Sequence, residues 1–178
     1  MSSERSESPR SIKRIARIAV IAVACLLIGV LCLRRGRAFQ IATPDSFAKV
    51  KSAKSLYGAL TPQEDKLVVR HFSVREKQTL VFWTDSLRNH LVEDLGYTLK
   101  EEGEFTTDAS LAGHRFLFEI SIGDVPYCYE LVVFVKQGWF QQHIYAAELL
   151  CAKKNFEKRA PAVETALKQF RPRHGWPL

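Results

Sequence analysis

The chain has 178 residues, which is about the length of one domain with a short extension. Its net charge of +7 is concentrated at the start, because residues 1–37 hold eight Lys and Arg against two Glu and residues 38–178 carry a balance of only +1. A nucleic-acid-binding domain would need a basic cluster on its folded part. We therefore expect no nucleic-acid partner.

Residues 18–33 form a run without a charged side chain, with basic residues on both sides of it. With Ile15 and Ala16 added, and with flanking arginines reaching toward the headgroups, such a run is long enough to cross a bilayer. The sequence predicts a basic tail (1–15), a transmembrane anchor (16–33), a basic juxtamembrane segment (34–37), a globular domain (38–171) and a loose tail (172–178).

Two other interpretations of the apolar run remain open. A cleaved secretory signal would end at small residues, whereas this run continues past Ala24 and ends in arginines. Residues 22–25 resemble a bacterial lipoprotein cleavage box, which would make Cys25 a lipid carrier, but the apolar run extends beyond it as well. A retained signal anchor is favoured. Five basic residues before the run against three after it favour an extracytoplasmic domain.

The domain begins with strand patterns. A short alternating stretch at 37–42 ends at a Thr-Pro turn, residues 49–60 are ambiguous, and residues 66–75 predict a second strand. Residues 97–99 and 105–107 predict two short strands around a polar turn. Residues 114–122, 127–135 and 140–151 predict three consecutive strands of an antiparallel meander.

Two amphipathic helices complete the predicted domain. In the first, Thr79 is the expected cap, apolar residues recur at helical spacing up to Leu95, and Gly96 is a stop signal. The second carries apolar residues from Phe156 to Phe170, with a regular helix expected from about residue 158 because of Pro161. The fold class predicted is α+β, an antiparallel sheet covered by two main helices.

Cys128 and Cys151 lie on the last two predicted strands. A turn centred at residues 137 and 138 places Cys128 opposite Ala147, which is more than ~10 Å from Cys151 along the strand. A disulfide needs Cα atoms within ~7 Å, so we expect two buried free thiols.

No catalytic motif is present: there is no GxSxG, Walker loop, HExxH, CxxC or GxGxxG. The five histidines show no metal-ligand spacing, so we expect no catalytic residue, metal or cofactor. An enzyme with a spatially assembled site stays open, with His71, His90 and His143 as its candidates. Trp139 and Phe140 at a hairpin tip are the candidate docking residues for a partner or for the membrane surface. Alternatively, Phe140 belongs to the strand and Trp139 covers the sheet edge.

The order of elements resembles the PsbP-like α/β/α sandwich, shared by the P subunit of the oxygen-evolving complex and a Ran-binding nuclear import factor. The resemblance lies in Phe39 and Ile41 before Pro44, the stretch 82–97, and the stretch 156–171. It implies a binding or assembly module, and no metal-binding residue is carried over. We therefore expect a single-pass membrane protein with a non-enzymatic domain that binds another protein; an enzyme or a small-ligand or lipid sensor is the alternative.

Overall fold

The computed structural model describes residues 39–51 and 57–172, and its described part is built on one seven-stranded antiparallel sheet. The strand order is β2-β3-β4-β8-β7-β6-β5, so the consecutive strands β5 to β8 form the predicted meander and β4 joins it beside β8. The strands are β2 (Ala48–Val50), β3 (Tyr57–Leu60), β4 (Lys66–Val74), β5 (Thr98–Thr106), β6 (Ala112–Ile122), β7 (Val125–Gln137) and β8 (Gln142–Ala152). A separate two-stranded ribbon pairs β1 (Phe39–Gln40) with β9 (Arg171–Pro172).

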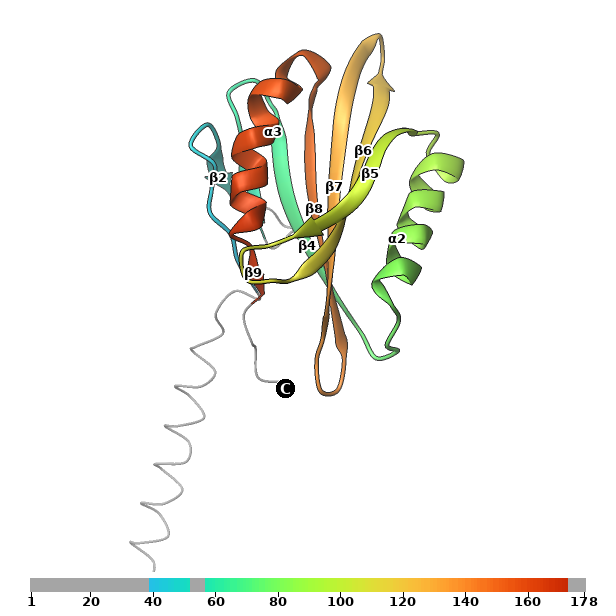
Figure 1. Cartoon of the computed structure of the whole chain (residues 1–178). Helices are drawn as coiled ribbons and strands as arrows, with labels where there is room; N and C mark the ends of the chain where they lie inside the picture. The colour runs from blue at the N-terminus through green and yellow to red at the C-terminus, as the bar shows by residue number, and fades with distance from the viewer. Residues whose placement is uncertain (1–38, 52–56, 173–178) are drawn as a thin grey trace, which may run out of the picture. The chain divides into compact units, whose positions relative to one another are not determined.

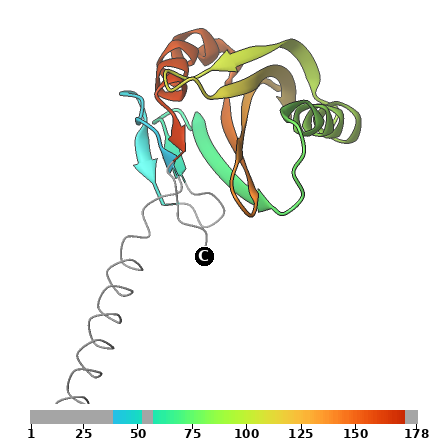
Figure 2. The same ribbon diagram turned by 60° about the horizontal axis from the view of Figure 1, so that its bottom comes forward.

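Two helices lie on opposite sides of the sheet (Figures 1 and 2). One side carries α2 (Leu80–Asn89) and the π-helical turn η1 (His90–Asp94), and the other carries α3 (Lys153–Lys168). The predicted α+β fold class, an antiparallel sheet covered by two helices, is confirmed. Each helix buries its own hydrophobic cluster, which explains why β7 is apolar on both faces.

The first helix begins as the sequence predicts. The Thr79 hydroxyl accepts a hydrogen bond from the Phe82 amide at 3.1 Å, which satisfies one of the free N–H groups of the first turn. The last turn widens to a π-helix at His90–Asp94, and Gly96 follows with a φ of 69°, the left-handed conformation that suits a glycine stop.

Three predicted boundaries are wrong. The two short strands predicted at 97–99 and 105–107 are one continuous strand, β5 (Thr98–Thr106), with a register shift between Leu99 and Glu101, because the polar Glu-Glu-Gly stretch faces solvent at the edge of the sheet. The last meander strand begins at Gln142, so Phe140 lies outside it. Helix α3 begins at Lys153, directly after β8, and keeps Pro161 in its interior.

The predicted register of the last hairpin is also wrong, by four residues. Cys128 lies directly opposite Cys151, because the hairpin turns through residues 138–141 and Gln137 pairs with Gln142. Directly paired residues of antiparallel strands lie within the Cα distance that a disulfide needs, so the prediction that the two cysteines are too far apart is wrong. Both cysteines are nevertheless free and buried in this structure.

The predicted anchor (16–33), the basic segments on either side of it, Cys25 and residues 173–178 of the tail lie outside the described residues. Within residues 39–51 and 57–172, no helix has the length and apolar character needed to cross a membrane. The membrane anchor and the side of the membrane therefore stay predictions.

Candidate functional site

The tip of the β7–β8 hairpin is the most exposed aromatic feature among the described residues. Its loop, residues 138–141, is closed by a hydrogen bond from the Gly138 amide to the Gln141 carbonyl at 2.9 Å. Trp139 is 85% exposed and Phe140 is 69% exposed, with ring centroids 6.2 Å apart. The alternative in which Trp139 covers the sheet edge and Phe140 belongs to the strand is thus wrong, and neither ring contributes to the core.

The hairpin has a fixed base. Gln142 is fully buried, and its side-chain oxygen accepts hydrogen bonds from Trp83 Nε1 at 2.8 Å and from the Gln78 amide at 3.2 Å. Its amide group donates in turn to the Gln78 carbonyl. Gly138 is required by the tight loop, because a Cβ there would lie 2.5 Å from the Gln141 carbonyl oxygen. The exposed rings are therefore carried on a rigid support.

Beside the base of the hairpin, the fold brings together two histidines that are 72 residues apart in sequence. Because β4 and β8 are neighbours, His71 lies opposite Tyr145 and Ser73 lies opposite His143. His71 Nε2 is 3.0 Å from His143 Nδ1, and the Ser73 hydroxyl is 3.1 Å from the same His143 nitrogen. The His71 ring also stacks on Tyr145, with centroids 4.8 Å apart.

Both imidazoles favour their neutral form. Burial, and then the neighbouring His143, lower the pKa of His71. Burial, and then the charge of Lys136, lower the pKa of His143. A neutral pair can share one hydrogen bond between its ring nitrogens, whereas a doubly protonated pair would place two positive charges at the same contact.

The chemistry available to this pair is limited by its surroundings. No group of three or more His, Cys, Asp or Glu side chains that could hold a metal ion occurs among the described residues. His90, the third candidate from the sequence, is not part of the cluster: it lies in η1 on the other side of the sheet, where its Nδ1 contacts Asp94 at 2.7 Å. The structure thus joins His71 and His143 and separates His90 from them.

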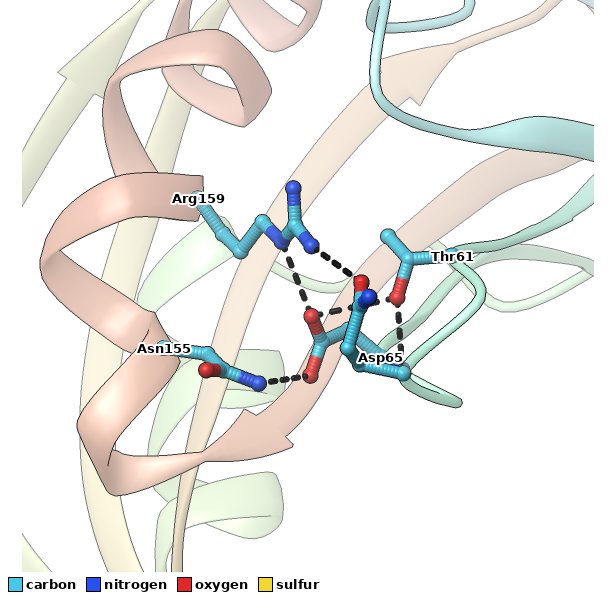
Figure 3. Close-up of polar contacts among 5 residues, drawn as sticks. Thr61, Asp65, Asn155 and Arg159 are labelled. Atoms are coloured by element: carbon cyan, nitrogen blue, oxygen red, sulfur yellow. Dashed lines mark hydrogen bonds and ion pairs between the residues drawn. The ribbon is translucent and has the colours of Figure 1, made fainter.

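A buried ionic network links the β3–β4 turn to α3 (Figure 3). The Asp65 carboxylate is 1% exposed and accepts hydrogen bonds from Arg159 Nε at 2.8 Å, from Asn155 Nδ2 at 3.1 Å and from the Thr61 hydroxyl at 3.1 Å. Burial by itself raises the pKa of this carboxyl, but the hydrogen bonds outweigh burial and hold the pKa below its usual range. Every charged group here is paired, so we interpret the network as structural.

A second buried carboxylate lies in β7. Glu130 Oε1 contacts Arg115 Nε at 2.7 Å, whereas Glu130 Oε2 has no hydrogen-bond partner among the described residues. Burial raises the pKa of Glu130, although Arg115 opposes that shift. This pair could not be predicted from the sequence, because the two residues stand on different strands and each resembles an ordinary surface charge.

A groove lies at the far end of the sheet, beside the β6–β7 hairpin. It has a volume of about 560 Å³, and its lining includes Leu95, Tyr97, Ile122, Pro126 and Tyr129. Leu95 is 50% exposed and Ile122 is 51% exposed. Burial, and then the nearby carboxylate of Glu148, raise the pKa of Tyr129, so its phenol stays protonated. This groove could not be predicted from the sequence, because it is formed by the η1–β5 connection and a hairpin that meet only in the fold.

No protein-family model matches the sequence, and no curated protein sequence matches it significantly. Solved structures do match. LpqN, which is involved in cell envelope biogenesis of Mycobacterium tuberculosis, superposes with a TM-score of 0.66 at 9% identity, over 75% of this chain and 82% of LpqN. Cyanobacterial PsbP (CyanoP) from Synechocystis sp. PCC 6803 superposes with a TM-score of 0.55 at 12% identity, over 77% of this chain and 88% of CyanoP.

The described domain has the PsbP-like fold. The resemblance drawn from the sequence pattern is therefore confirmed. A protein of unknown function from Pseudomonas aeruginosa, PA94, is similar to the same extent, with a TM-score of 0.55 at 10% identity over 79% of this chain and 87% of PA94. At these identities the likeness concerns the fold of the PsbP-like domain alone.

Proposed function

We propose that this chain is a membrane-anchored, non-enzymatic binding module, in which residues 16–33 tether the PsbP-like domain and the domain holds a segment of another protein. The groove beside the β6–β7 hairpin is the observation that carries the proposal. It combines a hollow of about 560 Å³ with two large apolar side chains, Leu95 and Ile122, that are each about half exposed. Exposed apolar residues gathered at a concave surface are typical of interaction sites.

The chemistry of the groove favours a protein segment over a small molecule. Pockets for small ligands bury most of the ligand surface, whereas Leu95 and Ile122 both face solvent. The groove also has a polar residue at its lining, Glu119, whose carboxylate is bonded to Lys100 at 2.9 Å and to Lys153. An apolar centre beside charged residues is the common pattern of a protein–protein interface.

The groove and the start of the described domain lie at different ends of the sheet. The groove stands at the end of the sheet formed by the β6–β7 hairpin, whereas the chain enters the domain at β1, beside the opposite end. We place the domain on the extracytoplasmic side, because the residues before the apolar run are the more basic flank.

Site-specific crosslinking tests the proposal. A photoreactive p-benzoylphenylalanine at Leu95 of the full chain, in its native membrane, should give a crosslinked protein product. The same group at Val81, which is 65% exposed on α2 and outside the groove, is the matched control and should give none. Absence of a product at both positions, or equal products at both, would contradict the proposed binding surface. A product of lipid or small-molecule mass would favour the sensing alternative.

The contact between His71 and His143 is the observation that favours the alternative function, an enzyme. Replacing both by Ala should leave the cellular role of a binding module intact, and His90→Ala is the matched control because His90 stands apart from the cluster. If only the double variant loses the cellular phenotype while its unfolding temperature is unchanged, the domain is an enzyme and the binding proposal is wrong.

A further inference from the structure

The chain enters the domain at the same end as the exposed hairpin tip. Helix α3 starts where β8 ends and returns along the sheet, so that Phe170 packs on Tyr145 and Phe134, with ring centroids 5.3 and 5.0 Å away. β9 continues in that direction and pairs antiparallel with β1, Phe39 opposite Pro172. β1 therefore runs away from the β7–β8 hairpin tip, and the described part of the domain begins at the end of β1 that is nearer this tip. Figure 1 shows β9 and this hairpin extending the same way.

The hairpin projects further in that direction than the point of entry. The Phe39 ring contacts Tyr145, with centroids 6.1 Å apart, and Tyr145 pairs with Phe134 across the hairpin. From Tyr145 to the first residue of the strand, Gln142, the backbone advances ~10 Å, and the loop that carries Trp139 lies beyond it.

The segment between the predicted anchor and the domain is short compared with this projection. Residues 34–38 are all that separate the predicted anchor from Phe39, and five residues span at most about 18 Å even when fully extended. The hairpin tip would stay clear of the bilayer surface only if these five residues were nearly extended and left the domain on its entry side.

The tip has the chemistry of a membrane interface. Tryptophan is enriched at the level of the lipid headgroups because its ring is apolar and its N–H is polar. The side chains around this end of the sheet, apart from the ion pair of Lys168 with Glu164, include four cations and two anions: Arg75, Lys77, Lys136, Arg171, Glu76 and Asp108. This excess of positive charge suits an anionic lipid surface.

From these observations we infer that Trp139 and Phe140 insert into the interfacial layer of the bilayer in which the chain is anchored, as a second contact that orients the domain. The inference rests on the anchor of the proposed function. With the tip at the membrane, the groove at the other end of the sheet faces away from it.

The test uses the full chain, labelled with 5-fluorotryptophan and reconstituted without any partner in nanodiscs of phosphatidylcholine and phosphatidylglycerol. Alkaline-resistant flotation with vesicles of the same lipids first establishes the anchor. Lipids carrying a nitroxide near the headgroup are then added, and the fluorine resonance of Trp139, assigned with Trp139→Phe, is compared with that of a Val125→Trp variant. Val125 is an exposed residue at the opposite hairpin, so the variant reports on the far end of the sheet.

We expect the nitroxide lipids to abolish the Trp139 resonance and to leave the resonance of Val125→Trp sharp. Equal sharpness of the two resonances in a chain that floats would overturn the inference, leave the anchor standing, and make the tip a protein-docking surface. Equal broadening would overturn it too, because the domain would then lie flat on the bilayer. If the chain does not float, it has no membrane anchor, and both the proposed anchoring and this inference are wrong.

Discussion

Replacing Asp65 by Ala is expected to destabilise the domain severely. The carboxylate is 1% exposed and is the acceptor for Arg159, Asn155 and Thr61, so its removal leaves the guanidinium of Arg159, whose side chain is 8% exposed, with only the Gln63 side chain as a partner at 2.8 Å. Breaking a buried ion pair by removing one partner typically costs about 3–5 kcal/mol. That is a large share of the stability of a domain, which is about 5–15 kcal/mol.

The measurement is urea unfolding of the full chain in a mild non-ionic detergent, followed by near-ultraviolet circular dichroism. Glu164→Gln is the matched control on the same helix, because it breaks the exposed pair with Lys168 and should cost no more than about 0.5 kcal/mol. Asn155→Ala should fall between the two, since it removes one hydrogen bond to a charged acceptor, worth about 1.5–3 kcal/mol.

The pH dependence gives an independent check on Asp65. Because its pKa is lowered in the folded state, the network stabilises the fold above the ordinary value of 3.8 and loses that contribution as the pH falls below it. The variant Asp65→Ala should lack this acid-dependent loss. A cost of less than about 1 kcal/mol for Asp65→Ala, or a cost equal to that of the control, would refute the view that this network holds α3 to the sheet.

Three further predictions concern the hairpin and its surroundings. Because the pKa values of His71 and His143 are lowered in the folded state, the unfolded chain binds more protons, and the free energy of unfolding should fall as the pH drops below 6.5. His143→Gln should make the free energy of unfolding depend less steeply on pH, as measured by urea titrations at several pH values. An unchanged pH dependence would contradict this prediction. Burial raises the pKa of Cys151 to about 12 and also raises that of Cys128. Neither thiol should therefore react with a hydrophilic disulfide reagent until the domain unfolds. Rapid labelling of the native protein would contradict this prediction and show that the cysteines are accessible. Gly138→Ala should lower the stability by about 1–3 kcal/mol, because the added Cβ meets a backbone oxygen, and a neutral effect in thermal unfolding would mean that the loop relaxes freely.

Local sequence patterns were sufficient for elements whose cause is local. The helix at 80–89 could be predicted with its Thr79 cap and its Gly96 stop, because capping and left-handed turns depend on neighbouring residues. The strands of the meander could be predicted because alternation and turn residues are local signals as well. Ile122 shows the limit of alternation, since it continues the alternating apolar pattern of β6 and yet is 51% exposed as the last residue of that strand.

The register of the β7–β8 hairpin could not be predicted from the sequence, and the cysteine pair shows why. Moving the hairpin turn from residues 137 and 138 to the loop at 138–141 carries Cys128 from opposite Ala147 to opposite Cys151. A shift of four residues leaves every side chain on the same face of the sheet, so the hydrophobic pattern is satisfied at either register.

The sequence by itself determined the α+β class, the two helices, the separation of a basic apolar leader from a nearly neutral domain, and the exposed aromatic pair as a candidate for docking. Only the tertiary structure decided that His71 meets His143, that Asp65 meets Arg159, and that Leu95 and Ile122 flank one groove, because each pair joins strands or helices whose proximity follows from the order β4-β8-β7-β6-β5. That order is set by burying both faces of the sheet at once, a condition that belongs to the whole domain.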